Sequence, residues 1–561
     1  MTELPIYTKK EKLVVSLFTL LIFSIFSFIV FTMNIHGDSR YHALSAKESV
    51  AQGALVQHQP YRIFNYMNNK RIYMPIAYPL TAESLFTTLY LFGGETFLKL
   101  YAPLFATCIF LMAYFCIREL GVIQATTTAT FATFAIGERL IMTPLMEPYF
   151  VLSLLTACLL LKKYYFSTKN STLFLAAGFL GTAACIKQQG LILATFIVGF
   201  IFIFLVYRFI KNDFSFLNLI KTFLPFLIIF IIVPLFALMN QIERTGTLAY
   251  APGGTGLNNS LPFSKYIQPL LKSKFQSNPA ATKAISLTIG YNRKKVNLIN
   301  KFKGFIMSPF LYFRSTDINY YANYQIMFVN FIVTVIFLCL ISKDKLVAQN
   351  KFTIILFTGL MGIETLTSYL FKTPITQYHS FGILITTILI FFFAHRLIIV
   401  TKYIRALMLG LLTTFFIIGY ANYIYPLWGQ SGRETNMQLE GYAKIADYVQ
   451  KKTPQQAIFL AAETSFRYYA QRDFIWLNES IGDDVYKIIN TTNDSTAVKT
   501  LKKMKVNYVV INREQIQRNG VNDYLPSDGL VSYIDNSKYF TKVYDAFGDD
   551  QMAVYRINNI Q

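Results

Sequence analysis

The chain has 561 residues, of which 54% are hydrophobic and only 15% charged, and its net charge is +22. This composition excludes an ordinary soluble domain, which carries more charge and less apolar surface. So basic a soluble protein would suggest nucleic acid as a partner. Here apolar stretches recur instead, so we expect no nucleic acid and place the basic excess in cytoplasmic loops or against anionic lipid.

The apolar stretches continue along the chain as far as residue 425. A helix of about twenty residues reaches about 30 Å, which matches the hydrocarbon thickness of a bilayer. We interpret the first as a retained membrane helix, because no small-residue cleavage site follows and many more stretches do. The segments are 13–33, 80–92, 98–117, 122–136, 149–161, 173–186, 191–209, 219–239, 324–341, 352–371, 381–400 and 406–425.

Basic clusters between these segments predict the orientation of the helices, since Lys and Arg collect in cytoplasmic loops. All the clusters are cytoplasmic only if one early segment does not cross. Segment 80–92 is the shortest, follows Pro79 and ends at Gly93–Gly94, so we expect a re-entrant or surface helix. The predicted fold class is a polytopic α-helical membrane protein with about eleven to thirteen transmembrane helices and a cytoplasmic N-terminus.

This topology places the residues with chemical potential on one face of the membrane. The cytoplasmic loops are short and basic, so an active site in this chain would face outward. The residues and parts that fall on the outer face are Asp38, Glu147, Lys187, His379, the loop 240–322 and the part after residue 428.

Two external loops interrupt the transmembrane domain, residues 1–428. The first, 34–97, contains the stretch SRYHALSAKESVAQGALV, which we expect to form an amphipathic helix along the membrane surface, with Tyr41 and Leu44 towards one side. The second, 240–322, is long and rich in basic residues. It is either a connector resting on anionic headgroups or a loop that closes over an anionic lipid substrate.

The part 429–561 changes in composition and alternates helical and strand patterns. MQLEGYAKIADYVQKK and STAVKTLKKMKV are typical of helices, and QAIFLAA, NYVVIN and MAVYRI of strands. The alternation predicts a small external α/β domain. It has no Gly-rich phosphate loop and no nucleophile elbow. We therefore expect a structural or acceptor-positioning cap rather than a second catalytic centre.

Two carboxylates are candidates for proton transfer at an external site. Asp38 follows Gly37, which permits a tight turn, and Arg40 is close enough in sequence to orient it or to bind a phosphate. Glu147 lies between two prolines at the outer end of another segment. Two acids in one cavity suit general-base chemistry. They can instead share Mg²⁺ or Mn²⁺, but without a DxD motif we predict no metal and no cofactor.

Cationic and polar residues at other outer helix ends are candidates for binding a phosphate. Lys187 is followed by Gln188 and Gln189, and Tyr378 precedes His379. The simpler interpretations are a snorkelling lysine and an ordinary interfacial histidine. Together with Arg40, these groups can form a cationic cradle for a leaving phosphate.

The chain also resembles a known family over about residues 13–210. The matching stretch is GDSRYHALSAKESVAQG, then PY, then MPIAYPLTAESLFTTLYLFGG, then LKLYAPLFATCIFLMAYFCIREL. This pattern resembles the GT-C glycosyltransferases, above all the protein O-mannosyltransferases and the aminoarabinose transferase of lipid A. The corresponding positions here are Asp38, Tyr41, Ala46, Gly53, Pro60–Tyr61, Pro79–Leu80, Phe92–Gly93, Pro103–Leu104, Arg118–Leu120, Glu147 and Lys187.

The chain departs from the family pattern at two places. Many members have two adjacent acids where this chain has Asp38–Ser39, and the SRY that follows is similar to TRY in the aminoarabinose transferase. The Glu–Lys pair of that enzyme is replaced by Tyr73–Met74. The sugar and the acceptor therefore do not follow from the resemblance.

The resemblance implies a transferase that uses a sugar on a polyprenyl phosphate or diphosphate. The acceptor would be a glycan, lipid or protein on the outer face of a prokaryotic cytoplasmic membrane. Asp38 would act as general base with Glu147 as the second catalytic acid, and the sugar would transfer with inversion. The donor phosphate would contact Arg40, Lys187, Tyr378 and His379. The substrates would be positioned by Tyr41, His42, Tyr61 and Gln188.

Two other functions are compatible with the sequence. A lipid or polysaccharide transporter or flippase would explain the many spans, although the chain has no internal repeat. A glycan polymerase or ligase would use a similar donor with a larger acceptor.

Overall fold

The structure is a computed structural model of the whole chain. It describes residues 8–32, 35, 38–56, 58–65, 70–75, 80–141, 144–211, 215–245, 350–371, 380–397, 430–461, 465–476, 488, 491–513 and 529–558. The predicted segments 324–341 and 406–425 and the loop 246–322 lie outside these residues, as do Tyr378 and His379.

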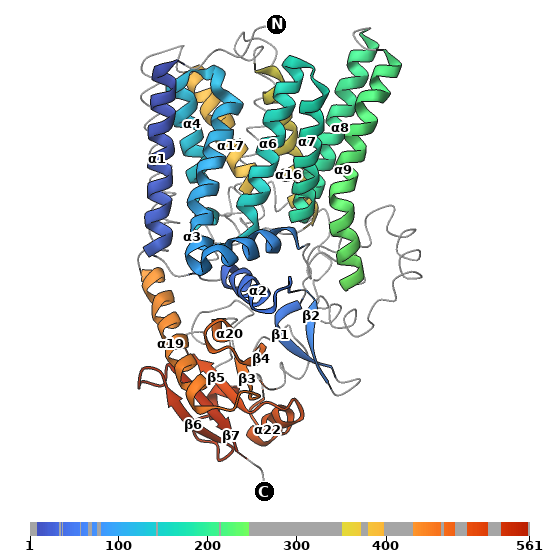
Figure 1. The fold of residues 1–561 in the computed structure, drawn as a ribbon. Helices are drawn as coiled ribbons and strands as arrows, with labels where there is room; N and C mark the ends of the chain where they lie inside the picture. Colours follow the sequence, from blue (N-terminus) through green and yellow to red (C-terminus); the bar gives the residue numbers. More distant parts are fainter. Residues whose placement is uncertain are drawn as a thin grey trace.

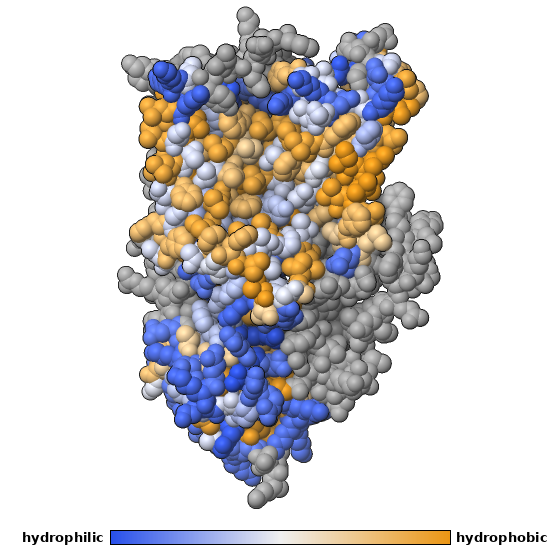
Figure 2. All heavy atoms as spheres, in the orientation of Figure 1, coloured by the Kyte–Doolittle hydropathy of each residue, from blue (hydrophilic) through white to orange (hydrophobic). Residues whose placement is uncertain are grey.

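An α-helical bundle forms the larger part of the molecule (Figure 1). In the described ranges, five helices are long and apolar enough to cross a membrane, and two shorter apolar helices accompany them. On the face shown in Figure 2, apolar side chains cover most of the bundle, and hydrophilic residues lie beyond them. The bundle is therefore that of a polytopic membrane protein, as the apolar segments predict. Its helices are α1 (Lys9–Thr32), α3 (Thr81–Ile117), α4 (Val122–Ala135), α5 (Gly137–Ile141), α6 (Met146–Ser167), α7 (Asn170–Ile186), α8 (Gln188–Ile210), α9 (Phe216–Thr245), α16 (Lys351–Phe371) and α17 (Ser380–Leu397).

Helix α3 has two parts separated by a kink at the glycine pair that the sequence singles out. Gly93 and Gly94 have non-helical backbone angles, and Gly94 has a φ of 59° with a ψ of −143°, which side chains with a Cβ rarely adopt. The first part, residues 81–92, lies across the end of the bundle, and the second part runs along the other helices (Figure 1). Segment 80–92 thus does not continue straight into the following span.

Ion pairs fix the opposite end of the bundle. Glu11 of α1 is buried and accepts hydrogen bonds from Tyr114 at 2.6 Å and from Arg118 Nε at 2.5 Å. Arg118 begins the short 3₁₀ helix Arg118–Leu120, and Lys162 of α6 pairs with Glu119 of the same turn. These contacts hold α1, α3 and α6 together at the end far from the C-terminal domain (Figure 1).

Helix α2 (Asp38–Gln52) is the helix predicted in the first external loop, and most of its described side chains are buried. It packs against the first part of α3 and against α20 (Ser465–Ala470), a helix of the C-terminal domain. Arg40, His42, Leu44 and Ser45 are all less than 5% exposed, so no single apolar face meets lipid. The placement of α2 along the membrane surface stays a prediction.

The C-terminal domain contributes five strands to a seven-stranded sheet, whose order is β2-β1-β4-β3-β5-β7-β6. Its central strands β4, β3 and β5 are parallel, and β7 and β6 follow in antiparallel pairs. The strands QAIFLAA, NYVVIN and MAVYRI were predicted, whereas β4 and β6 were not. The strands are β3 (Ile458–Ala461), β4 (Asp473–Trp476), β5 (Tyr508–Asn512), β6 (Phe540–Asp545) and β7 (Met552–Ile557).

A hairpin from the first external loop completes this sheet. Strands β1 (His58–Asn65) and β2 (Lys70–Pro75) pair antiparallel, and Arg62 of β1 pairs in parallel with Ile475 of β4. The sheet therefore joins the N-terminal part of the chain to the C-terminal domain. The helices of that domain are α19 (Gln430–Lys452), α20, α22 (Asp494–Lys503) and α23 (Leu530–Tyr533), of which α19 and α22 were predicted.

Candidate active site

A buried ion pair joins the ends of three helices on the side of the bundle that faces the C-terminal domain. Lys187, between α7 and α8, donates a hydrogen bond to Glu147 in the first turn of α6. Their side chains are only 7% and 9% exposed. A charge buried without a partner is costly, so the contact between the two side chains is what allows both to lie in this place.

The tight connection between α7 and α8 places Lys187 at this point. Lys187 has an extended backbone, with φ −151° and ψ 150°, so α7 ends just before it and α8 begins just after it. A Cβ on Gly190 would lie 1.9 Å from the carbonyl oxygen of Ala183. Only glycine lets the first turn of α8 approach the last turn of α7 so closely.

Tyr101 of α3 fixes the first turn of α6. Its hydroxyl donates to the carbonyl of Leu145 at 2.7 Å and accepts from the backbone N–H of Tyr149 at 3.1 Å. The Tyr101 ring meets Phe86, in the first part of α3, edge to face at 5.4 Å. These contacts connect the start of α6, where Glu147 lies, to the helix part that crosses the end of the bundle.

Helix α2 is attached to the same part of α3 by a second buried pair. The Nδ1 atom of His42 lies 2.6 Å from Glu83 Oε1, and the two side chains are 5% and 2% exposed. The imidazole also lies 5.5 Å from the Phe86 ring. Sequence reasoning named His42 but missed Glu83, although an acid in a short helix at the outer face was a usable signal.

Asp38 is the first residue of α2, and its side chain is outside the described atoms. Asp38 and His42 are four positions apart, so they share one face of the helix. Arg40 Nε donates to the carbonyl of Ile35 at 2.7 Å, which ties the guanidinium to the turn before α2. The Tyr41 ring meets the His42 ring edge to face at 5.1 Å.

The remaining predicted residues are only partly placed. Tyr61 lies in β1 and Gln188 begins α8, but neither side chain is described. The structure thus brings Glu147 and Lys187 together, and it attaches His42 to α3 at the base of the helix that Asp38 begins. Within the described ranges, no group of three His, Cys, Asp or Glu side chains comes together to hold a metal ion.

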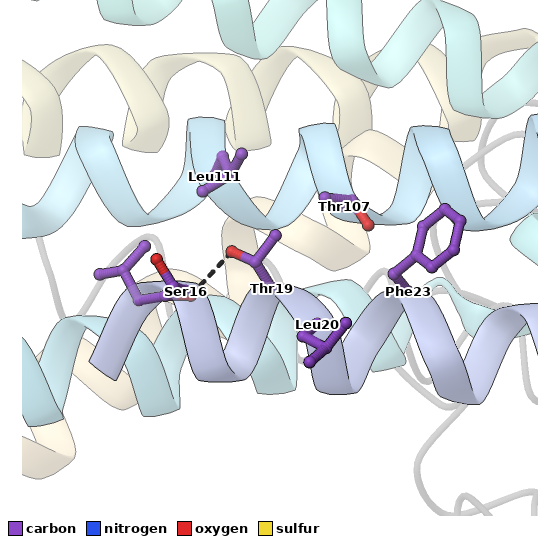
Figure 3. A pocket seen from close by; sticks show the side chains of 7 residues that line it. Ser16, Thr19, Leu20, Phe23, Thr107 and Leu111 are labelled. Atoms are coloured by element: carbon purple, nitrogen blue, oxygen red, sulfur yellow. Dashed lines mark hydrogen bonds between the residues drawn. The ribbon is translucent and has the colours of Figure 1, made fainter. Parts of the chain in front are cut away.

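A groove of about 430 Å³ lies elsewhere, between α1 and the second part of α3 (Figure 3). The Thr19 hydroxyl in it donates to the Val15 carbonyl at 2.7 Å, and neighbouring Leu17 and Leu20 of α1 are exposed. The groove therefore opens toward lipid and contains none of the candidate residues. Its lining is Val15, Ser16, Thr19, Leu20, Phe23, Thr107 and Leu111.

The chain was compared with known proteins. No protein-family model matches it, and no curated protein matches it. Among solved structures, the oligosaccharyltransferase of Archaeoglobus fulgidus in its apo form has 12% identity and a TM-score of 0.52, over 89% of this chain and 70% of that one. The same enzyme, AglB, in complex with an inhibitory peptide and a dolichol-phosphate has 11% identity and a TM-score of 0.51, over 89% and 69%.

A third structure, apo ArnT from Cupriavidus metallidurans, has 11% identity and a TM-score of 0.46, over 96% of this chain and 97% of that one. The likeness to the oligosaccharyltransferase shows that the chain shares the fold of that membrane enzyme. This confirms the fold that the sequence resemblance implied.

Proposed function

We propose that the chain transfers a sugar from a polyprenyl phosphate or diphosphate to an acceptor hydroxyl on the outer face of the membrane. The observation that carries this proposal is the buried Glu147–Lys187 pair, held at the same end of the bundle as the start of α2. A fixed cation there suits a phosphate, and the acid that begins α2 suits the acceptor hydroxyl.

Lys187 supplies the positive charge for the donor. An ammonium group has three N–H donors, so Lys187 can keep its bond to Glu147 while another N–H binds a phosphate oxygen. Glu147 fixes the direction of the lysine side chain through their hydrogen bond. The cation then stabilises the negative charge that develops on the phosphate as its bond to the sugar breaks.

Asp38 acts as the general base. Its carboxylate takes the proton of the acceptor hydroxyl while the oxygen forms a bond to the anomeric carbon of the sugar. The bond between that carbon and the phosphate oxygen breaks, and the electron pair leaves with the polyprenyl phosphate. Attack from the face opposite the leaving group inverts the anomeric centre.

The other candidate residues assist this reaction. Arg40 holds the turn before α2 and contributes positive charge near Asp38, and Tyr378 and His379 complete the phosphate contacts. Tyr41, His42, Tyr61 and Gln188 position the substrates. A lipid donor agrees with the fold, since the structure of AglB was solved in complex with an inhibitory peptide and a dolichol-phosphate.

The decisive experiment measures release of the free lipid phosphate. The purified full chain in nanodiscs is incubated with a panel of polyprenyl-phosphate sugars and a membrane extract, and the products are identified by mass spectrometry. We expect Asp38→Asn to lower release by about 100-fold to 10,000-fold, the usual contribution of a general base. Asp447→Asn, an exposed acid of α19, is the matched control and should leave release unchanged.

Two outcomes would contradict the proposal. Full release by Asp38→Asn would remove the role assigned to that residue. Lipid that binds unchanged, with flux across proteoliposomes and no covalent product, would favour the transporter instead. A product with many sugar units would indicate the polymerase or ligase.

A further inference from the structure

The C-terminal domain makes direct contact with the helix that Asp38 begins. Arg467 of α20 donates to Glu48 of α2 through Nε at 2.6 Å, across 419 positions of sequence. The two side chains are only 12% and 15% exposed, and Arg467 also lies 3.6 Å from Asp473 of β4. A pair with so little solvent has fixed geometry, unlike an ordinary surface salt bridge.

Tyr468, the next residue of α20, contacts both α2 and α3. Its hydroxyl donates to Glu95 Oε2 at 2.8 Å, directly after the kink of α3. Its carbonyl accepts from Lys47 Nζ of α2 at 3.1 Å, and the same ammonium lies 4.9 Å from the ring centroid. Tyr468 is 5% exposed, so this junction is packed.

The electrostatics of the junction show that it is partly desolvated. Burial lowers the pKa of Lys47 below its ordinary value, although the carboxylates of Glu95 and Glu48 oppose the shift. Burial also raises the pKa of Tyr468, so its hydroxyl remains a hydrogen-bond donor at neutral pH. The contact between α2 and α20 is therefore made of charged and polar groups that have lost part of their water and interact with one another.

Strand pairing strengthens the same connection. After α2 the chain enters β1, which joins β4 of the C-terminal sheet, and β4 follows α20 closely in sequence. Helix α2 is thus attached at its start to α3, through His42 and Glu83, and at its end to α20. A displacement of α20 would move α2 and, with it, the position of Asp38.

We infer that Arg467 and Tyr468 are positioning residues of the active site, through which the C-terminal domain sets the placement of α2 and of Asp38. This inference rests on the proposed function for its catalytic consequence, but not for the placement of α2 itself. Catalysis by a general base depends on its placement within a fraction of an ångström. The C-terminal domain is then a working part of the transferase rather than a passive cap.

The test compares Arg467→Ala, Arg467→Lys, Glu48→Ala and the double variant Arg467→Ala/Glu48→Ala in the full chain. We expect Arg467→Ala to lower kcat by roughly 10-fold to 100-fold with the donor KM close to wild type, since the donor contacts lie at Lys187. Arg467→Lys should restore part of kcat. The double variant should be no worse than either single variant, because both remove one interaction.

A second measurement does not need the donor. Hydrogen–deuterium exchange of the amides in α2 should be roughly tenfold faster in Arg467→Ala, with β6 and β7 unchanged. Lys451→Ala, which removes an exposed pair with Asp447 on α19, is the control and should alter neither kcat nor exchange in α2.

The results separate the two proposals. Wild-type protein that releases no lipid phosphate contradicts the proposed function, while faster exchange in α2 still supports the role of Arg467 in placing that helix. Unchanged exchange in α2 overturns the inference, whatever the activity. So does a loss of donor affinity with normal kcat, because a positioning role acts on turnover.

Discussion

Lys187 and Glu147 form a buried ion pair across 40 positions of sequence, where the ends of α6, α7 and α8 meet. Both groups have lost nearly all contact with solvent. In such a pair the cost of desolvation is large, and the pair adds little net stability compared with apolar residues of similar size. A pair that stability alone does not require is a reasonable place for a binding function.

This ion pair predicts that substitutions at Lys187 and Glu147 affect stability and activity differently. Lys187→Met leaves the Glu147 carboxylate buried and unpaired, so it should lower the free energy of unfolding by about 3–5 kcal/mol. The double variant Lys187→Met/Glu147→Met should recover most of that stability but none of the activity. Denaturant unfolding in detergent and the release assay check both results. A double variant that is active would exclude a phosphate-binding role for Lys187.

The pair between His42 and Glu83 predicts a measurable coupling between α2 and α3. An ionised carboxylate only accepts hydrogen bonds, so it fixes the proton on His42 Nδ1 and the orientation of the ring. A double-mutant cycle with His42→Ala and Glu83→Ala should give a coupling energy of about 1–3 kcal/mol, as for contacting buried groups. The exposed pair Glu440–Lys444 on α19 is the comparison, with about 0.5 kcal/mol or less expected. Equal couplings would contradict a fixed His42–Glu83 contact.

The parts of the fold that the sequence predicted have local causes. The glycine pair at 93–94 breaks α3 because Gly94 has a positive φ, and a short apolar segment before it made the break visible. Strands β3, β5 and β7 are rich in Val, Ile and aromatic residues, which favour strands. The basic clusters in the loops predicted that Glu147 and Lys187 lie on the same face of the membrane.

The parts that the sequence did not predict depend on partners far away in the chain. The hairpin β1–β2 joins β4 through Arg62 and Ile475, and no local pattern specifies that pairing. Helix α2 was expected to lie along the membrane surface because Tyr41 and Leu44 fall towards one side. Two of its polar side chains, His42 and Glu48, contact Glu83 and Arg467, which only the folded chain brings near. The role of Asp38 stays a prediction.

Gly190, in the first turn of α8, predicts a loss of stability and of donor binding that depends on which glycine of this helix is substituted. Gly190→Ala places a methyl group 1.9 Å from the Ala183 carbonyl, so α7 and α8 must separate and Lys187 must move away from Glu147. We expect a loss of stability of about 1–3 kcal/mol from this overpacking, together with a loss of donor binding. Gly199→Ala in the same helix has open space around it and should be neutral or stabilising. Thermal unfolding of both variants in nanodiscs measures this difference. Equal unfolding temperatures for Gly190→Ala and Gly199→Ala would contradict the prediction.

Glu364 of α16 is a buried acid, and a buried charge needs a partner. It is 2% exposed, and its carboxyl group lies beside Gly382 in the first turn of α17. A Cβ on Gly382 would lie 2.8 Å from Glu364 Oε2, so glycine permits this close approach. The first backbone N–H groups of a helix lack partners within the helix, so we expect the Glu364 carboxyl group to cap α17 from a neighbouring helix.

Removing this cap should weaken the contact between α16 and α17. Glu364→Leu leaves the Gly382 N–H buried without an acceptor and should cost about 1–3 kcal/mol in the free energy of unfolding, whereas Glu364→Gln keeps an acceptor oxygen and should cost less. Because α17 directly follows Tyr378 and His379 in sequence, the Leu variant should also bind the donor more weakly than the Gln variant. Unfolding curves and donor binding are measured on both proteins. If Glu364→Leu is as stable as the wild type, the carboxyl group does not cap α17, and its burial in the membrane needs a different explanation.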